Sequence, residues 1–93
     1  MILKDLVTHS LILLKKGLYD ESYRMINSAK ETARFEKNHF ALAEILSLEK
    51  KLVGQMNIRS KEELLRKITF EEDVILTEIL LFQKYTKIMN VLD

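Results

Sequence analysis

The feature that most limits what this chain can fold into is its near lack of chain-breaking residues. Its 93 residues contain no proline and two glycines, Gly17 and Gly54. Sharp turns between strands draw on both residue types, whereas helix interiors avoid them. Leu, Lys, Glu and Ile dominate the remainder, and apolar residues make up 47% of the chain. The sequence therefore predicts a helical protein with enough apolar side chains for one core.

Charge and cysteine content exclude several classes of protein. Fifteen basic and 14 acidic residues give a formal net charge of +1, which is no general field for nucleic acid or anionic lipid. There is no cysteine for disulfides or thiol chemistry. No apolar run reaches the roughly 18 residues that a membrane span needs, and the N-terminus does not resemble a signal peptide. We therefore expect a cytoplasmic protein with no membrane contact.

The first third of the chain predicts a helical hairpin. An apolar arc over about residues 2–16 has the small residue Ser10 at its centre, which favours close approach of another helix, and Ile12 stands alone on the polar side. Gly17 is expected to end this helix. A second helix is expected from a cap at Asp20 to about Glu36, antiparallel to the first. Its inward stripe is Tyr19, Ser22, Tyr23, Ile26, Ala29 and Ala33.

The third predicted helix, over about residues 39–53 with Asn38 as its cap, has two apolar faces. One face is Ala41, Ile45, Leu48 and Leu52, and the other is Leu42, Leu46 and Val53. A helix that is apolar on two sides packs between two neighbours, so this helix should lie centrally. Residues 54–59 are the expected loop.

The C-terminal segment, residues 60–92, contains two capping-box patterns. Ser60 with Glu63 and Thr69 with Glu72 predict a short helix over 61–67 and a long one over 70–91, or else a single kinked helix. The long helix is apolar around most of its circumference. Met89 belongs to a broad apolar face, and Leu76 and Leu80 form a second, separate patch. This excess predicts either self-association or a chain that is part of a longer protein. The candidate self-association surface is Leu76, Leu80, Ile79 and Phe82.

The segment Gly17-Leu18-Tyr19-Asp20-Glu21-Ser22 resembles the turn of a tetratricopeptide repeat. That family joins two antiparallel helices through Gly-x-Tyr-x-Glu-Ala, and the resemblance covers about residues 3–36. His9 and Arg34 stand where the family has Leu and Pro. The resemblance implies a concave groove for a peptide, lined by one face of the first helix in each two-helix unit. The corresponding positions are Lys4, Val7, Leu11, Leu14, Phe40, Glu44 and Ser47. The alternative is that Val7, Leu11 and Leu14 are core residues.

The residues that catalysis or metal binding would need are sparse. His9 and His39 are the only histidines, and neither shares a helix face with further ligands. Glu71, Glu72 and Asp73 are expected to complement the positive end of a helix dipole at a helix start. The basic residues at the ends of two helices are expected to complement the negative dipole ends there: Lys15, Lys16, Lys50 and Lys51. We expect no enzymatic activity and no cofactor.

Together these patterns predict one all-α domain over residues 1–93, an antiparallel array of four to five helices that begins with a tetratricopeptide-like hairpin. Residues 1–53 would form the hairpin plus the third helix. The expected function is protein–protein interaction or scaffolding. The alternative is a small regulatory protein that acts through homodimerisation; the near-neutral charge disfavours nucleic-acid contact as a further role.

Overall fold

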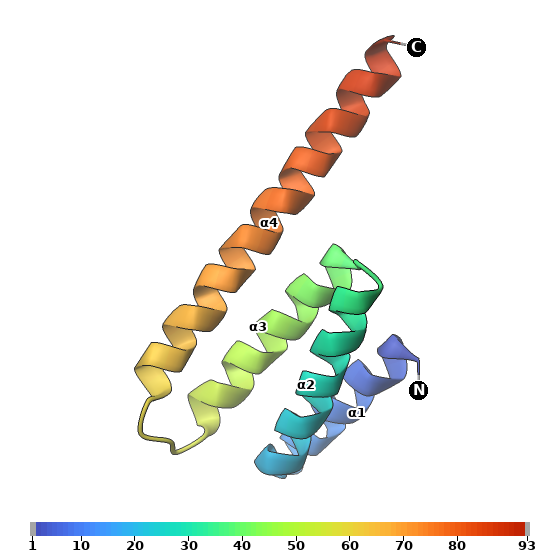
Figure 1. The fold of residues 1–93 in the computed structure, drawn as a ribbon. Helices are drawn as coiled ribbons and strands as arrows, with labels where there is room; N and C mark the ends of the chain where they lie inside the picture. The colour runs from blue at the N-terminus through green and yellow to red at the C-terminus, as the bar shows by residue number, and fades with distance from the viewer. Residues whose placement is uncertain (1, 93) are drawn as a thin grey trace.

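The computed structural model describes residues 2–92, and the side chains as far as Ile88. Four helices make up the described chain: α1 (Leu3–Lys15), α2 (Tyr19–Phe35), α3 (His39–Gln55) and α4 (Lys61–Leu92). Each helix runs antiparallel to the one before it (Figure 1). The predicted all-α antiparallel array is confirmed.

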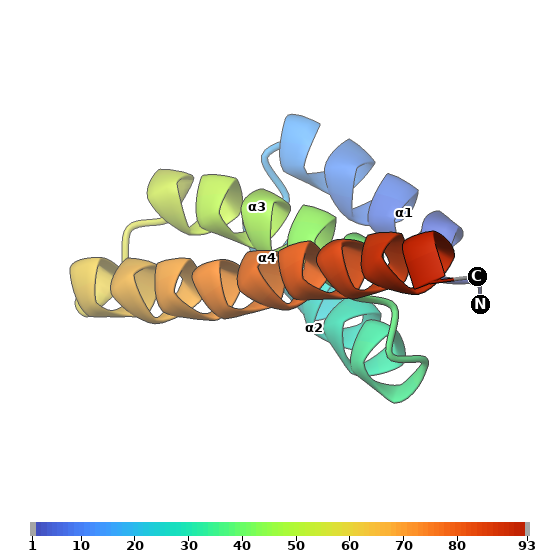
Figure 2. The same ribbon diagram turned by 90° about the horizontal axis from the view of Figure 1, so that it is seen from above.

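The helices form two layers, with α1 and α3 in one and α2 and α4 in the other (Figure 2). Helix α3 packs against α2 on one side and α4 on the other, and it also touches α1. Its two apolar faces, Ile45 and Leu52 on one and Leu46 and Val53 on the other, are completely buried. The central position predicted from those two faces is confirmed.

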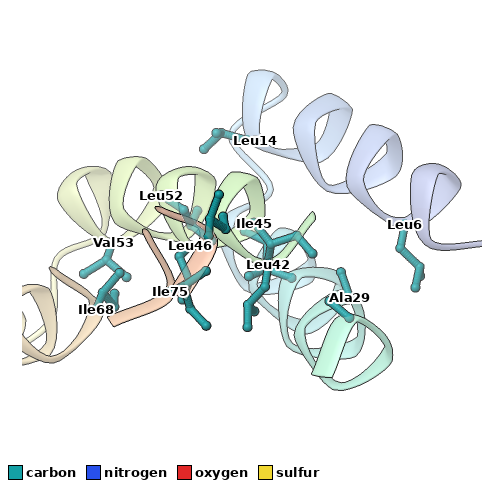
Figure 3. Close-up of a cluster of buried hydrophobic side chains, with 13 residues drawn as sticks. Leu6, Leu14, Ala29, Leu42, Ile45, Leu46, Leu52, Val53, Ile68 and Ile75 are labelled. Carbon is teal, nitrogen blue, oxygen red and sulfur yellow. The ribbon is translucent and has the colours of Figure 1, made fainter. Parts of the chain in front are cut away.

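The core is centred on α3 (Figure 3). Helix α2 contributes Ile26 and the small residues Ala29 and Ala33, all nearly inaccessible to solvent, and small side chains there let the helices approach closely. Helix α4 contributes three isoleucines from one face. The buried apolar residues are Leu6, Leu14, Ile26, Ala29, Ala33, Leu42, Ile45, Leu46, Leu52, Val53, Ile68, Ile75 and Ile79.

The first two turns have the same backbone geometry. After α1, the Leu18 N–H donates to the Leu13 carbonyl at 2.9 Å and Gly17 has φ +77°. After α2, the Asn38 N–H donates to the Ala33 carbonyl at 2.9 Å, and Lys37 has φ +55°. Both are Schellman caps, which satisfy the last carbonyls of the helix. The predicted end at Gly17 is confirmed, and Lys37 repeats it without a glycine.

Helix starts were predicted with mixed success. The Asn38 side chain accepts a hydrogen bond from the Ala41 N–H at 3.1 Å, so this cap is confirmed. The Asp20 cap is wrong, because α2 begins at Tyr19 after Leu18, which makes no side-chain cap bond. The loop is also shorter than expected, because α3 includes Gly54 and continues to Gln55.

Residues 61–92 form one helix, so the break predicted at residues 68–69 is wrong and the single-helix alternative holds. Thr69 therefore lies inside α4, where no backbone N–H needs a cap. Ile68, in the expected connection, is buried against the core. The helix continues through residues 68–69 because burying Ile68 against α3 stabilises the chain more than a second helix cap would.

The acidic cluster of α4 has a different role from the predicted one. Glu71, Glu72 and Asp73 lie well inside α4 and so cannot complement the dipole at its start. Instead, Glu71 pairs with Arg34 of α2, and Glu72 accepts a hydrogen bond from Lys50 of α3 at 2.7 Å. The expected dipole role of Lys50 and Lys51 is likewise wrong, because α3 has no basic residue in its last turn. These ion pairs hold α4 alongside α2 and α3.

No helix among the described residues is long and apolar enough to cross a membrane.

Candidate functional site

A groove runs between α1 and α3 on the layer that these two helices share. Its widest part, a hollow of about 720 Å³, lies at the N-terminal end of α1 beside the α2–α3 turn. A second hollow of about 260 Å³ shares Val7 and Glu44 with the first. A third, of about 470 Å³, shares Leu11 and Lys51 with the second and ends at Gly17 and Tyr19. The three hollows therefore lie in a row along α1, each adjoining the next, and together they are called the groove.

The structure brings together most of the predicted groove residues. Six of them line it: Lys4, Val7, Leu11, Leu14, Glu44 and Ser47. Leu14 borders the groove at its far end but is buried in the core. Phe40 lines none of the three hollows and is 61% exposed. Phe40 therefore does not belong with the groove residues.

Further groove residues were not predicted, and they give the groove a charge polarity. Lys15, Lys16 and Lys51 line the hollow at the C-terminal end of α1. Glu36 lines the opposite end together with Glu44 and Lys4. The signal was present in the sequence, because Leu14 and Lys15 follow Leu11 by three and four residues and so lie near its helix face. The basic end could be assigned to the groove only after α3 had been placed next to α1.

Two buried serines hold α1 against α2, and this contact helps to position one wall of the groove. Ser10 and Ser22 are both completely inaccessible to solvent, and the Ser22 hydroxyl donates to the Ser10 carbonyl at 2.8 Å. The Ser10 hydroxyl donates to the Val7 carbonyl at 2.8 Å. Ser10 was predicted to allow close helix approach, and its burial confirms this prediction. With Ser10 facing α2, Leu11 is left at the groove.

A buried ion pair between α2 and α3 lies beneath the groove layer. The Lys30 ammonium lies 3.0 Å from both carboxylate oxygens of Glu49, whose side chain is 1% exposed. Burial, and then the negative charge of Glu49, raises the pKa of the Tyr23 hydroxyl above its ordinary value. The sequence analysis did not single out Glu49. Its position between Ile45, Leu46, Leu52 and Val53, three or four residues away on either side, could have shown that it faces inward.

The candidate self-association residues do not share one exposed surface. Ile79 is buried against the core, so its assignment to that surface is wrong. Leu76, Leu80 and Phe82 are 45%, 65% and 64% exposed. Met89 lies outside the described side chains. Ile79 is buried because it continues the face of Ile68 and Ile75, which packs on α3.

The two histidines lie apart from the groove. His9 is exposed on α1. The Nε2 atom of His39 lies 3.3 Å from a carboxylate oxygen of Glu78 on α4. Within residues 2–92 there is no group of three or more His, Asp or Glu side chains placed to hold a metal ion. The features of the groove that can act on a ligand are therefore its shape, its apolar surface and its charged side chains.

Comparisons with protein-family models, with curated proteins and with solved structures give no match to this chain.

Proposed function

We propose that this protein is a non-catalytic helical interaction module that holds a peptide segment of another protein in the groove between α1 and α3. The observation that carries the proposal is the row of three adjoining hollows along the whole of α1, from Lys4 to Gly17. Recognition sites for helices and extended peptides are grooves of this kind, with an apolar floor and polar groups at the edges. Here Val7 and Leu11 supply apolar surface between polar residues of both helices.

The arrangement of the helices supports the proposal. A tetratricopeptide-like hairpin would place its first helix beside the first helix of the next unit, and here α1 and α3 share a layer (Figure 2). Helices α2 and α4 form the outer layer.

The charges along the groove favour a peptide of defined chemistry and direction. Lys15, Lys16 and Lys51 would attract acidic side chains or a terminal carboxylate at one end. Glu36 and Glu44 would disfavour acidic groups at the other end. We therefore expect the bound segment to have apolar residues over Leu11 and acidic residues towards Lys51.

A second candidate function is regulation through homodimerisation, and the exposed apolar residues of α4 favour it. Nucleic-acid contact would require the basic residues to overcome a net charge of only +1. Binding to DNA or RNA duplexes or single strands that weakens with salt would support such contact, and no binding at low salt would exclude it.

The groove is tested by selecting peptides from a random phage-displayed library on the immobilised chain and mapping the selected peptides by NMR. We expect enriched peptides to carry acidic residues and to shift the amide signals of Val7, Leu11 and Ser47. Enriched peptides that shift only α4 signals would contradict the groove assignment, and so would repeated selections that enrich nothing.

A further inference from the structure

A row of large apolar side chains lies exposed along the outside of α4. Phe70 is 71% exposed, Val74 40%, Leu81 60%, Tyr85 63% and Ile88 52%. At 100° per residue these five positions fall within an arc of about 60°, and they span about 27 Å along the helix. They are called the outer stripe below: Phe70, Val74, Leu81, Tyr85 and Ile88.

The outer stripe is distinct from the face of α4 that packs on α3. Ile68, Ile75 and Ile79 are buried, and their side of the helix lies about 130° from the centre of the stripe. A helix with two apolar faces packs between two neighbours, as α3 does. For α4 the described chain supplies a neighbour on one face only, and the C-terminal part of the helix extends past the other three helices (Figure 1).

The spacing of the outer stripe is that of a coiled coil. Phe70, Val74, Leu81 and Ile88 are separated by four, seven and seven residues, and Thr77 and Lys84 complete the alternation of four and three. This alternation keeps one face of a helix against a partner helix over several turns. A second helix with the same repeat is therefore a geometrically matched occupant.

We propose that a second copy of this chain covers the outer stripe, with the two α4 helices antiparallel. The charges beside the stripe carry this choice. Asp73 flanks its N-terminal half and Lys87 its C-terminal half; both are exposed and pair with no described residue. An antiparallel pair brings Asp73 near Lys87 of the other copy, twice by symmetry.

A parallel pair would place Asp73 beside Glu78 of the other copy and Lys84 beside Lys84, and like charges on facing helices oppose association. On the other flank of the stripe, Glu71 and Glu78 already pair with Arg34 and His39 within one chain. The stripe therefore complements itself in the antiparallel direction. This inference is independent of peptide binding, because the residues that line the groove come mainly from α1 and α3, which form the other layer of the molecule.

Sedimentation equilibrium of the wild-type chain and two matched variants tests whether the outer stripe is the dimer interface. We expect a concentration-dependent dimer, whose dissociation constant rises about tenfold or more in Leu81→Glu. Leu76→Glu, on the same helix but outside the stripe, should leave dimerisation unchanged. A wild-type monomer at every concentration would overturn the proposal, and so would a Leu81→Glu variant that dimerises as well as the wild type.

The orientation is tested by charge exchange and by a distance. Asp73→Lys should weaken the dimer, and the double variant Asp73→Lys/Lys87→Asp should restore it. The chain has no cysteine, so Glu62→Cys accepts a single spin label on an exposed site. Antiparallel pairing centred near residue 79 separates the two labels by about 50 Å, whereas parallel pairing brings them within about 20 Å. The shorter distance would overturn the antiparallel arrangement.

The two proposals fail separately. Leu81→Glu should leave binding of the groove-selected peptides intact, because the substitution lies on α4 and the groove is lined by α1 and α3. Loss of dimerisation with retained peptide binding therefore tests the outer stripe alone.

Discussion

The Ser22 hydroxyl donates a hydrogen bond to the main-chain carbonyl of Ser10, with 2.8 Å between the two oxygens and both residues completely buried. This bond joins the middle of α1 to the first turn of α2. The Ser10 carbonyl thus has a partner from α2 where solvent cannot reach. The contact links the hairpin to the groove, because Val7 and Leu11 lie on either side of Ser10 along α1.

Replacing Ser22 tests the contribution of this bond. Ser22→Ala removes the donor and leaves the Ser10 carbonyl buried with one partner fewer, so we expect unfolding to become easier by about 1–2 kcal/mol. Urea denaturation followed by circular dichroism measures this. Ser28→Ala, at an exposed site on the same helix, is the matched control and should change stability by less than about 0.5 kcal/mol. Equal effects of the two substitutions would contradict the account.

Breaking the Lys30–Glu49 pair from one side should be costly. Lys30→Met leaves the Glu49 carboxylate buried without its cation, and we expect a loss of about 3 kcal/mol of unfolding free energy. The double variant Lys30→Met/Glu49→Met removes both charges and should lose less than the single variant. A single variant as stable as the wild type would show that Glu49 is solvated.

The two Schellman turns predict substitutions of opposite sign. Gly17→Val should destabilise by about 1 kcal/mol or more, because a β-branched residue is strained at φ +77°. A Cβ at Gly17 meets no atom within 4 Å, so the cost is backbone strain alone. Lys37→Gly should stabilise by up to about 1 kcal/mol, because it relieves the positive φ of a non-glycine residue. Thermal melting of both variants checks the signs, and shifts in the same direction would be inconsistent with the cap geometry.

The pKa of Tyr23 predicts a loss of stability in alkali. Its folded-state pKa is raised by burial and by Glu49, so the neutral hydroxyl is favoured in the folded state. Its contribution is complete below the unfolded pKa of about 10 and is lost as the pH rises through the folded value. Between about pH 9 and 12 the wild type should therefore lose more unfolding free energy than Tyr23→Phe. Parallel curves for the two proteins would argue against the shift.

Local patterns predicted the parts of the fold that depend on one helix at a time. The two apolar faces of α3 predicted its central position, and Gly17 predicted the end of α1. Asn38 predicted a cap because its side chain reaches a backbone N–H within the same turn. Each of these features is decided by residues within a few positions of one another.

Features that depend on pairs of distant residues could not be predicted in this way. Thr69 with Glu72 has the form of a cap, but burial of Ile68 on α3 keeps the helix continuous. The partner of Glu49 lies 19 residues away on another helix. For the groove, the tetratricopeptide resemblance grouped Phe40 with Leu11, whereas the packing of α3 leaves Phe40 outside.

The central claim, that the α1–α3 groove binds a peptide, is tested most directly by two substitutions at adjacent residues. Leu11 lines the groove and Ile12 does not, although they are similarly exposed at 38% and 43%. In calorimetric titration with a groove-selected peptide, the dissociation constant of Leu11→Glu should be at least about tenfold higher than that of the wild type. Ile12→Glu should bind within about twofold of the wild type. Unchanged binding by Leu11→Glu, or equal losses in both variants, would contradict the account.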